Sequence, residues 1–147
     1  EIILAIDGSN SIRESDFFGP LLGFVEEFYN VTRSNTRLGV IIFNAEIEFR
    51  IPLKYYSEQD WSGMVEALRN RRSGRNAVCC SFGTPIAEAF DLAYAEFTDA
   101  ARIQLLGGVR DRYVLLISDG RPRQRKPQDL RRVEYLYRTV PTAASKL

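Results

Sequence analysis

Histidine is absent from the 147-residue chain, and its absence excludes two common chemistries. Without an imidazole there is no Ser-His-Asp or Cys-His catalytic group, and the commonest ligand of zinc and copper sites is missing. Cysteine is almost as scarce, because the two cysteines are the neighbours Cys79 and Cys80, which cannot join distant segments. A disulfide framework is therefore excluded, and cysteine usage does not indicate the redox compartment.

Cys79 and Cys80 leave three states open: a vicinal disulfide, two free thiols, or a bond to a segment outside this chain. A bond between adjacent cysteines has strained geometry. We therefore expect free thiols or an external bond.

Long apolar runs and a strong net charge are also lacking. The longest apolar runs have about five residues, far fewer than the roughly twenty that a membrane-spanning helix needs. Lys and Arg total 20 against 19 Asp and Glu, a net charge of +1, so no overall field favours nucleic acid or a membrane surface. With 45% hydrophobic residues, the length fits one globular domain over residues 1–147, with no nucleic-acid partner and no membrane insertion.

Short apolar runs alternate along the chain with longer segments of helical periodicity. Three nearly continuous apolar runs are typical of strands buried on both faces: residues 2–6, 37–43 and 113–117. Residues 46–53 alternate like an edge strand, which Pro52 is expected to end. Apolar residues at helical spacing predict helices within the segments 17–29, 61–68, 86–97 and 130–137.

Buried strands separated by helices indicate an α/β fold. We expect a Rossmann-like, doubly wound, mainly parallel sheet with one antiparallel edge strand and helices on both faces. Ligands of such sheets bind beyond the C-terminal ends of the strands. This rule singles out residues 7–11, 83–85 and 118–120, which meet at one edge if the first and last strands are neighbours.

These three segments offer hydroxyl and carboxylate oxygens, with no imidazole or thiolate. Hard divalent cations prefer such ligands, and Mg²⁺ takes about six oxygens in octahedral geometry. Neutral hydroxyls beside a cation leave its charge largely uncompensated, while carboxylates acting through bound water orient the site. An open coordination position would then attract an external carboxylate. The pattern predicts that an acidic partner is bound through a metal ion and is not cleaved.

Each segment also has a purely structural interpretation. Ser11 to Glu14 has the form of a capping box, Thr84-Pro85 that of an ordinary helix start, and Asp-Gly pairs are common in turns. Taken singly, the structural interpretation is favoured. With 8 Asp and 10 Ser in the chain, however, Asp-x-Ser-x-Ser is expected only about 0.04 times by chance. Its position after the first strand, with the other two segments in order, favours the metal site.

Several motifs resemble the von Willebrand factor type A (vWA) domain family. Asp7-Gly8-Ser9-Asn10-Ser11-Ile12, followed by Asp16-Phe17, looks like the opening of that family's metal-ion-dependent adhesion site. Residues 36–43 resemble its second strand, Gly83-Thr84-Pro85-Ile86 its threonine loop, and residues 115–122 its fourth strand with the final aspartate. The resemblance covers essentially the whole chain.

The resemblance implies a site for Mg²⁺ or Mn²⁺ made by Asp7, Ser9, Ser11, Thr84 and Asp119. Ser9 and Ser11 would ligate the ion directly, and Thr84 would do so in the ligand-competent state. Asp7 and Asp119 would act mostly through water. A Glu or Asp of a protein partner would complete the coordination shell.

Two features depart from the family pattern. The threonine loop is usually richer in glycine, whereas here Cys79-Cys80-Ser81-Phe82 precede Gly83. The family also continues into further strands and a C-terminal helix, which are either absent from this chain or diverged beyond recognition. We therefore expect residues 1–147 to be a C-terminally incomplete vWA domain from a longer protein.

The resemblance implies a non-enzymatic adhesion or protein-binding module, secreted or on the cell surface, because the first motif looks like that of extracellular members. One alternative is an intracellular assembly or scaffold module of a larger complex, since the family also serves inside cells. A phosphotransfer enzyme of similar topology is a further alternative. Such enzymes need a second carboxylate where this chain has Ser9, so we do not expect an enzyme.

Two weaker signals lie beside these motifs. Basic residues flank the proposed site on both sides, at Arg72 and Arg75 and at Arg121, Arg123, Arg125 and Lys126. They form either an ordinary solvated surface or a positive rim that favours acidic or sulfated partners. Asn30-Val31-Thr32 has the form of an N-glycosylation acceptor, which arises easily by chance.

Overall fold

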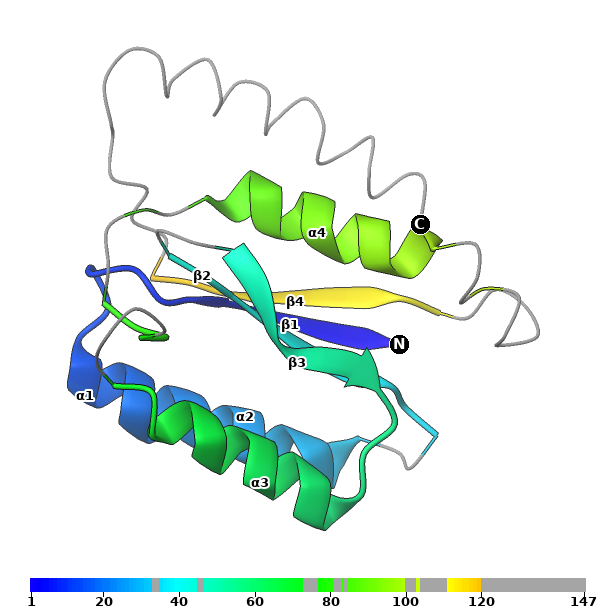
Figure 1. Ribbon diagram of the computed structural model, residues 1–147, viewed down its shortest axis with the longest axis horizontal. Helices are drawn as coiled ribbons and strands as arrows, with labels where there is room; N and C mark the ends of the chain where they lie inside the picture. Colours follow the sequence, from blue (N-terminus) through cyan, green and yellow to red (C-terminus); the bar gives the residue numbers. More distant parts are fainter. Residues whose placement is uncertain are drawn as a thin grey trace.

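The computed structural model describes residues 1–32, 35–44, 47–72, 77–80, 83, 85–99, 103 and 111–119. Four strands and their helices follow one another along these residues (Figure 1). In chain order they are β1 (Ile2–Asp7), α1 (Glu14–Asp16), the π-helix η1 (Phe17–Leu21), α2 (Leu22–Val31), β2 (Leu38–Phe43), β3 (Ile47–Lys54), α3 (Glu58–Arg69), α4 (Ile86–Thr98) and β4 (Tyr113–Ile117).

The strands form one sheet in the order β3-β2-β1-β4. β1 pairs in parallel with both β2 and β4, whereas β2 and β3 are antiparallel. Helices α2 and α3 cover one face of the sheet and α4 covers the other (Figure 1). This arrangement confirms the predicted mainly parallel α/β fold with an antiparallel edge strand.

The core consists of two apolar clusters, one on each side of the sheet. Leu4 and Ile6 of β1 pack with Trp61 and other side chains of the α2–α3 side. Ile3 and Ala5, the alternate residues of β1, pack against the α4 side. Because β1 lies between two helical layers, both of its faces are apolar, which explains its continuous hydrophobic run.

The predicted end of β3 at Pro52 is wrong, because the strand continues to Lys54. β3 lies at one edge of the described sheet, and its register with β2 shifts between the pairs Leu38–Lys54 and Val40–Ile51. Pro52 has no assigned partner within this irregularity. A proline is tolerated there because it lacks only an N–H that an edge position need not donate.

Residues 113–117 form a strand, as predicted, but the prediction that this strand is buried is wrong. Tyr113 is 59% exposed, and Leu115 and Leu116 are 40% and 39% exposed. β4 is the outer strand on its side of the described sheet, so it is less covered than β1 and β2. The helix expected within 130–137 lies outside the described residues.

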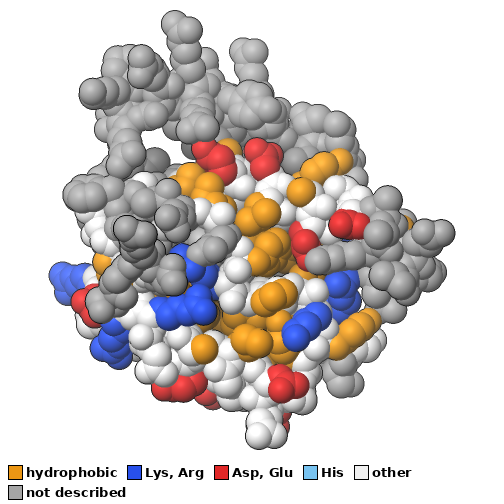
Figure 2. All heavy atoms as spheres, in the orientation of Figure 1, with side chains coloured by type: hydrophobic (Ala, Val, Ile, Leu, Met, Phe, Trp, Pro, Cys, Tyr) orange, Lys and Arg blue, Asp and Glu red, His pale blue; other side chains and the backbone are white. Residues whose placement is uncertain are grey.

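The face on which β3 lies carries hydrophobic side chains over its middle, with Lys and Arg side chains on both sides of them (Figure 2). In β3, Ile47 and Phe49 are only partly buried and pack against the cluster on the α4 side. Within the part of the chain that the structure describes, no helix combines the length and apolar character needed to cross a membrane.

Candidate metal-binding site

Asp7 ends β1 and has both carboxylate oxygens engaged. Its side chain is fully buried, and Oδ1 accepts a hydrogen bond from the Ser9 N–H at 2.9 Å. Oδ2 accepts a hydrogen bond from the Ser118 hydroxyl at 2.6 Å. The register places Ile6 opposite Ile117, so Ser118 follows β4 directly beside Asp7. The neighbouring strands therefore hold this carboxylate in one orientation.

Ser9 and Ser11 bring their hydroxyl groups together, with Oγ atoms 2.7 Å apart. Ser9 is almost fully buried and Ser11 is partly exposed. The Ile12 N–H donates to the Ser9 carbonyl at 3.2 Å, which turns the chain before the helix begins. Helix α1 starts at Glu14 with Arg13 as its capping position and no side-chain cap. The capping-box interpretation of Ser11 is therefore wrong, because its hydroxyl pairs with Ser9 instead.

Gly8 lies where no side chain fits. A Cβ atom at this position would be 2.5 Å from the Val78 carbonyl oxygen and 2.9 Å from Cγ2 of Ile42. The Gly8 N–H donates to the Phe43 carbonyl at 2.9 Å, and its own carbonyl accepts from the Cys80 N–H at 2.7 Å. The turn after β1 is thus held between the end of β2 and the segment 77–80.

Cys79 and Cys80 form a disulfide with each other. The expectation of free thiols or an external bond is therefore wrong. The backbone of Cys80 has a φ of 73°, which belongs to the left-handed region, and this turn lets the adjacent side chains meet. The pair belongs to the segment that contacts Gly8, so it lies against the turn that carries Ser9 and Ser11.

The donor set fits a hard divalent cation. Two neighbouring ligands of octahedral Mg²⁺ lie about 2.9 Å apart, given metal–oxygen distances near 2.05 Å. The hydroxyls of Ser9 and Ser11 are 2.7 Å apart and need little adjustment to serve as such a pair. Across the described ranges there is no group of three or more His, Cys, Asp or Glu that could hold a metal.

The remaining predicted ligands stand differently. Asp119 follows Ser118 and is exposed at the same edge of the sheet as Asp7. Thr84 lies outside the described residues, between Gly83 and Pro85, which directly precedes α4. The structure thus brings Asp7, Ser9 and Ser11 together and places Asp119 at their edge of the sheet.

The sequence did not predict two contacts that the structure places at this site. Ser118 lies at a strand end, but its hydrogen bond to Asp7 follows from the β1–β4 register. Cys80 was singled out as half of an adjacent pair and as part of the segment before Gly83, but its backbone contact with Gly8 joins positions far apart in the chain. Neither contact leaves a local signal in the sequence.

Arg72 is the one residue of the proposed basic rim that the structure describes. It is exposed, its guanidinium carbon lies 4.8 Å from the Phe18 ring centroid, and its Nε donates to the Arg69 carbonyl at 3.3 Å. An open hollow lies next to it, lined by Glu14, Ser15, Phe18, Gly19 and Arg72. The other rim residues lie outside the described residues: Arg75, Arg121, Arg123, Arg125 and Lys126.

Asn30, the predicted glycosylation acceptor, is exposed near the end of α2. Its side-chain amide donates to a Glu27 carboxylate oxygen at 2.9 Å. The position is accessible, and modification stays a prediction.

Residues 2–121 match the sequence profile of the family described as von Willebrand factor type A domain. The chain belongs to this family. The predicted membership of the vWA family is thereby confirmed, and vWA domains are protein-interaction modules. No curated protein sequence matches the chain.

Solved structures resemble this vWA domain at low sequence identity. An aerotolerance-related membrane protein from Bacteroides fragilis NCTC 9343, carrying multiple mutations to serines, has a TM-score of 0.59 and 22% identity, with 84% of this chain and 56% of that chain covered. The conserved hypothetical protein BatB from Bacteroides thetaiotaomicron has a TM-score of 0.58 and 22% identity, with 84% and 55% covered.

A third solved structure is the proximal thread matrix protein 1 from the mussel byssus. Its TM-score is 0.54 at 17% identity, with 90% of this chain and 32% of that chain covered. This vWA domain spans little more than half the length of the two Bacteroides chains and about a third of the mussel chain. At such identities the likeness shows the shared fold alone.

Proposed function

We propose that this vWA domain is a non-enzymatic module that captures an acidic residue of a protein partner through a divalent cation. The proposed ligand set is Asp7, Ser9, Ser11, Thr84 and Asp119, with Mg²⁺ or Mn²⁺ as the cation. The observation that carries the proposal is the 2.7 Å hydroxyl pair of Ser9 and Ser11 beside the buried carboxylate of Asp7. We further propose that the module acts in adhesion, secreted or at a cell surface.

Each described residue has a distinct part in the proposal. Ser9 and Ser11 are neutral ligands that bind a cation without cancelling its charge. Asp7 orients the site, because the Ser9 N–H and the Ser118 hydroxyl already occupy its two oxygens. A bound Mg²⁺ would supply an open coordination position that favours the carboxylate of a partner. Asp119, exposed beside Ser118, would add negative charge at the rim of the site.

Thermal unfolding with and without cation tests the proposal directly. A cation at about 100 times its dissociation constant stabilises the folded state by about 2.7 kcal/mol. For a domain of this size, the midpoint should rise on the order of 5–10 °C with Mg²⁺ or Mn²⁺. Ser9→Ala and Asp119→Ala should lose this rise. Ser15→Ala, which changes an exposed serine in α1, should keep it.

The quantity compared is the cation-induced shift of each variant, since the substitutions also change the midpoint without cation. An unchanged midpoint in wild-type protein that unfolds cooperatively would contradict the metal site. If the cation does raise the midpoint, the next step is to screen Glu- and Asp-containing peptides for binding, with and without chelator. Partner binding that persists in chelator would favour the alternative of an assembly or scaffold module.

A further inference from the structure

We propose that the Cys79–Cys80 disulfide is a redox-sensitive latch that holds the metal loop, residues 7–12, in its cation-binding shape. This inference rests on the proposed function, because it concerns the loop that carries Ser9 and Ser11. It adds a means of controlling cation affinity at that site.

The latch contacts the metal loop on both sides of the two serines. The Cys80 N–H donates to the Gly8 carbonyl at 2.7 Å, directly before Ser9. Sγ of Cys80 lies 3.6 Å from the carbonyl oxygen of Ile12, directly after Ser11. A shift of Cys80 would therefore release the loop at both ends of the hydroxyl pair.

The other end of the latch is anchored in the core. Val78 is fully buried, its N–H donates to the Arg71 carbonyl at 3.2 Å, and its carbonyl accepts from the Asn44 side chain at 3.3 Å. Cys79 is 7% exposed and belongs to the apolar cluster on the α2–α3 side. Because Val78 and Cys79 are fixed in the core, the S–S bond restrains the position of Cys80.

The backbone at Cys80 explains why the bond matters. Its φ of 73° is the one left-handed value of a non-glycine residue within the described ranges. A residue with a Cβ atom disfavours this conformation. The disulfide closes a ring that contains the Cys79–Cys80 peptide, so the Cys80 backbone cannot rotate independently. Once the ring is open, Cys80 is free to return to negative φ, and the peptide between Cys79 and Cys80 can rotate with it. Rotation of that peptide turns the Cys80 N–H away from the Gly8 carbonyl.

The redox step is an exchange with an external dithiol. A thiolate of the dithiol attacks Sγ of Cys80, which is the more exposed of the two, and the S–S bond breaks with Cys79 leaving as thiolate. The second thiol of the dithiol then displaces Cys80 from the mixed disulfide. In total, the protein gains two electrons and two protons as two thiols, and the dithiol leaves as a disulfide. Oxidation by a small-molecule disulfide reverses the exchange.

The first experiment compares Mn²⁺ and Mg²⁺ affinity of the oxidised and reduced protein by calorimetric titration. The reduced sample is treated with dithiothreitol and desalted without oxygen, and its thiols are counted before titration. Disturbing groups that orient metal ligands weakens binding by about 10–100-fold, so reduction should raise the dissociation constant about tenfold. Hydrogen–deuterium exchange of metal-free protein should show faster exchange in residues 8–12 after reduction.

Two double variants separate the disulfide from the backbone conformation that it imposes. Cys79→Ser/Cys80→Ser should reproduce the weak affinity and fast exchange of the reduced protein. Cys79→Ser/Cys80→Gly should recover most of the affinity, because glycine adopts positive φ without steric conflict. Neither variant should respond to dithiothreitol.

The outcomes distinguish this inference from the proposed function. If the oxidised wild type binds no cation, the proposed function fails. In that case, hydrogen–deuterium exchange of residues 8–12 in metal-free protein still tests whether the disulfide holds the loop. Equal affinity and equal exchange in both redox states would overturn the latch. Two free thiols in protein that was never reduced would also overturn it, as would a glycine variant as weak as the serine variant.

Discussion

Gly8 shows at the scale of a single residue how tightly the metal loop is enclosed. The space that a Cβ would need is taken by the backbone oxygen of Val78 and by a methyl group of Ile42. A backbone atom has little freedom to move away, unlike the end of a flexible side chain. Gly8 is therefore required by close approach of three chain segments.

Gly8→Ala should lower the free energy of unfolding by about 1–3 kcal/mol, as overpacking of a filled site does. Gly63→Ala is the matched control, because a Cβ at this exposed position in α3 meets nothing within 4 Å. That control should raise stability by about 0.5–1 kcal/mol, since alanine favours helix interiors over glycine. Urea unfolding of both variants measures the two effects. Equal changes in the same direction would contradict the steric account.

At the scale of elements, Tyr56 joins β3 to the two helices beneath the sheet. Its hydroxyl donates to the Pro52 carbonyl at 2.7 Å, and its own carbonyl accepts from the Tyr29 hydroxyl at 2.9 Å. Its ring contacts Trp61 with 5.4 Å between centroids, and the Trp61 indole donates to the Val25 carbonyl at 2.9 Å. Helices α2 and α3 and strand β3 are therefore linked through three aromatic side chains, those of Tyr29, Tyr56 and Trp61.

Burial, together with the nearby negative charge of Asp60, raises the pKa of Tyr56 from 10.0 to about 12. The folded state thus favours the neutral hydroxyl. The stability that Tyr56 contributes is therefore fully present below about pH 10 and is lost as the pH rises towards 12. At pH 9 the free energy of unfolding of wild type should exceed that of Tyr56→Phe by about 1 kcal/mol, the contribution of one hydrogen bond. This difference should shrink between about pH 10 and 12 in urea unfolding. Parallel pH curves for the two proteins would contradict the assignment.

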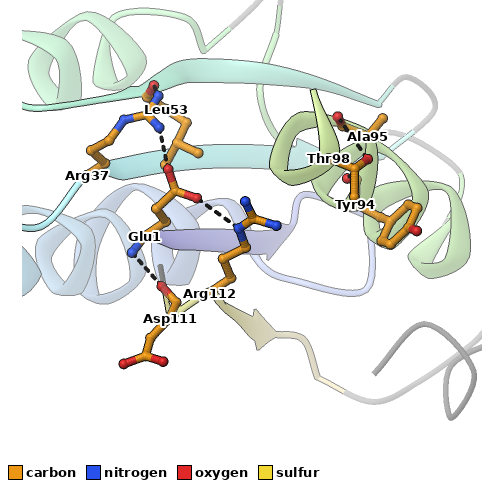
Figure 3. A network of polar contacts seen from close by, with 8 residues as sticks. All are labelled: Glu1, Arg37, Leu53, Tyr94, Ala95, Thr98, Asp111 and Arg112. Atoms are coloured by element: carbon orange, nitrogen blue, oxygen red, sulfur yellow. Dashed lines mark hydrogen bonds and ion pairs between the residues drawn. The ribbon is translucent and has the colours of Figure 1, made fainter. Parts of the chain in front are cut away.

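At the scale of the whole molecule, Glu1 ties the strands together at the end of the sheet opposite the site (Figure 3). Its carboxylate pairs with Arg37, which precedes β2, and lies 3.2 Å from Nε of Arg112, which precedes β4. Arg37 also donates to the Leu53 carbonyl of β3 at 2.8 Å. One buried carboxylate thus connects the starts of the parallel strands with the antiparallel edge.

Glu1→Gln should reduce the free energy of unfolding by about 3 kcal/mol, because it leaves two largely buried guanidinium groups without their carboxylate. The matched control is Glu26→Gln, which breaks the more exposed pair with Arg69, with side chains 34% and 25% exposed. The control should change stability by less than about 1 kcal/mol. Chemical unfolding at neutral pH compares the two. Similar losses would mean that burial does not set the strength of the Glu1 network.

Most of the local elements and the family could be predicted from the residues alone. β1, β2 and α4 carry uninterrupted apolar patterns, and such patterns specify secondary structure because they depend on near neighbours along the chain. The oxygen-rich motifs at residues 7–11 and 118–120 were also visible, since the ends of parallel strands place ligands in a known position.

Which of these groups come into contact depends on how the strands and loops pack in three dimensions. Asp7 accepts a hydrogen bond from the Ser118 hydroxyl because β1 and β4 pair in one register, although more than a hundred residues separate the two strands along the chain. Ser11 pairs with Ser9 because the chain turns before α1 begins. Cys80 reaches Gly8 because buried Val78 fixes the segment before it. The Asp7–Ser118 and Gly8–Cys80 contacts join positions far apart in the sequence, so their geometry is set by packing of the whole domain.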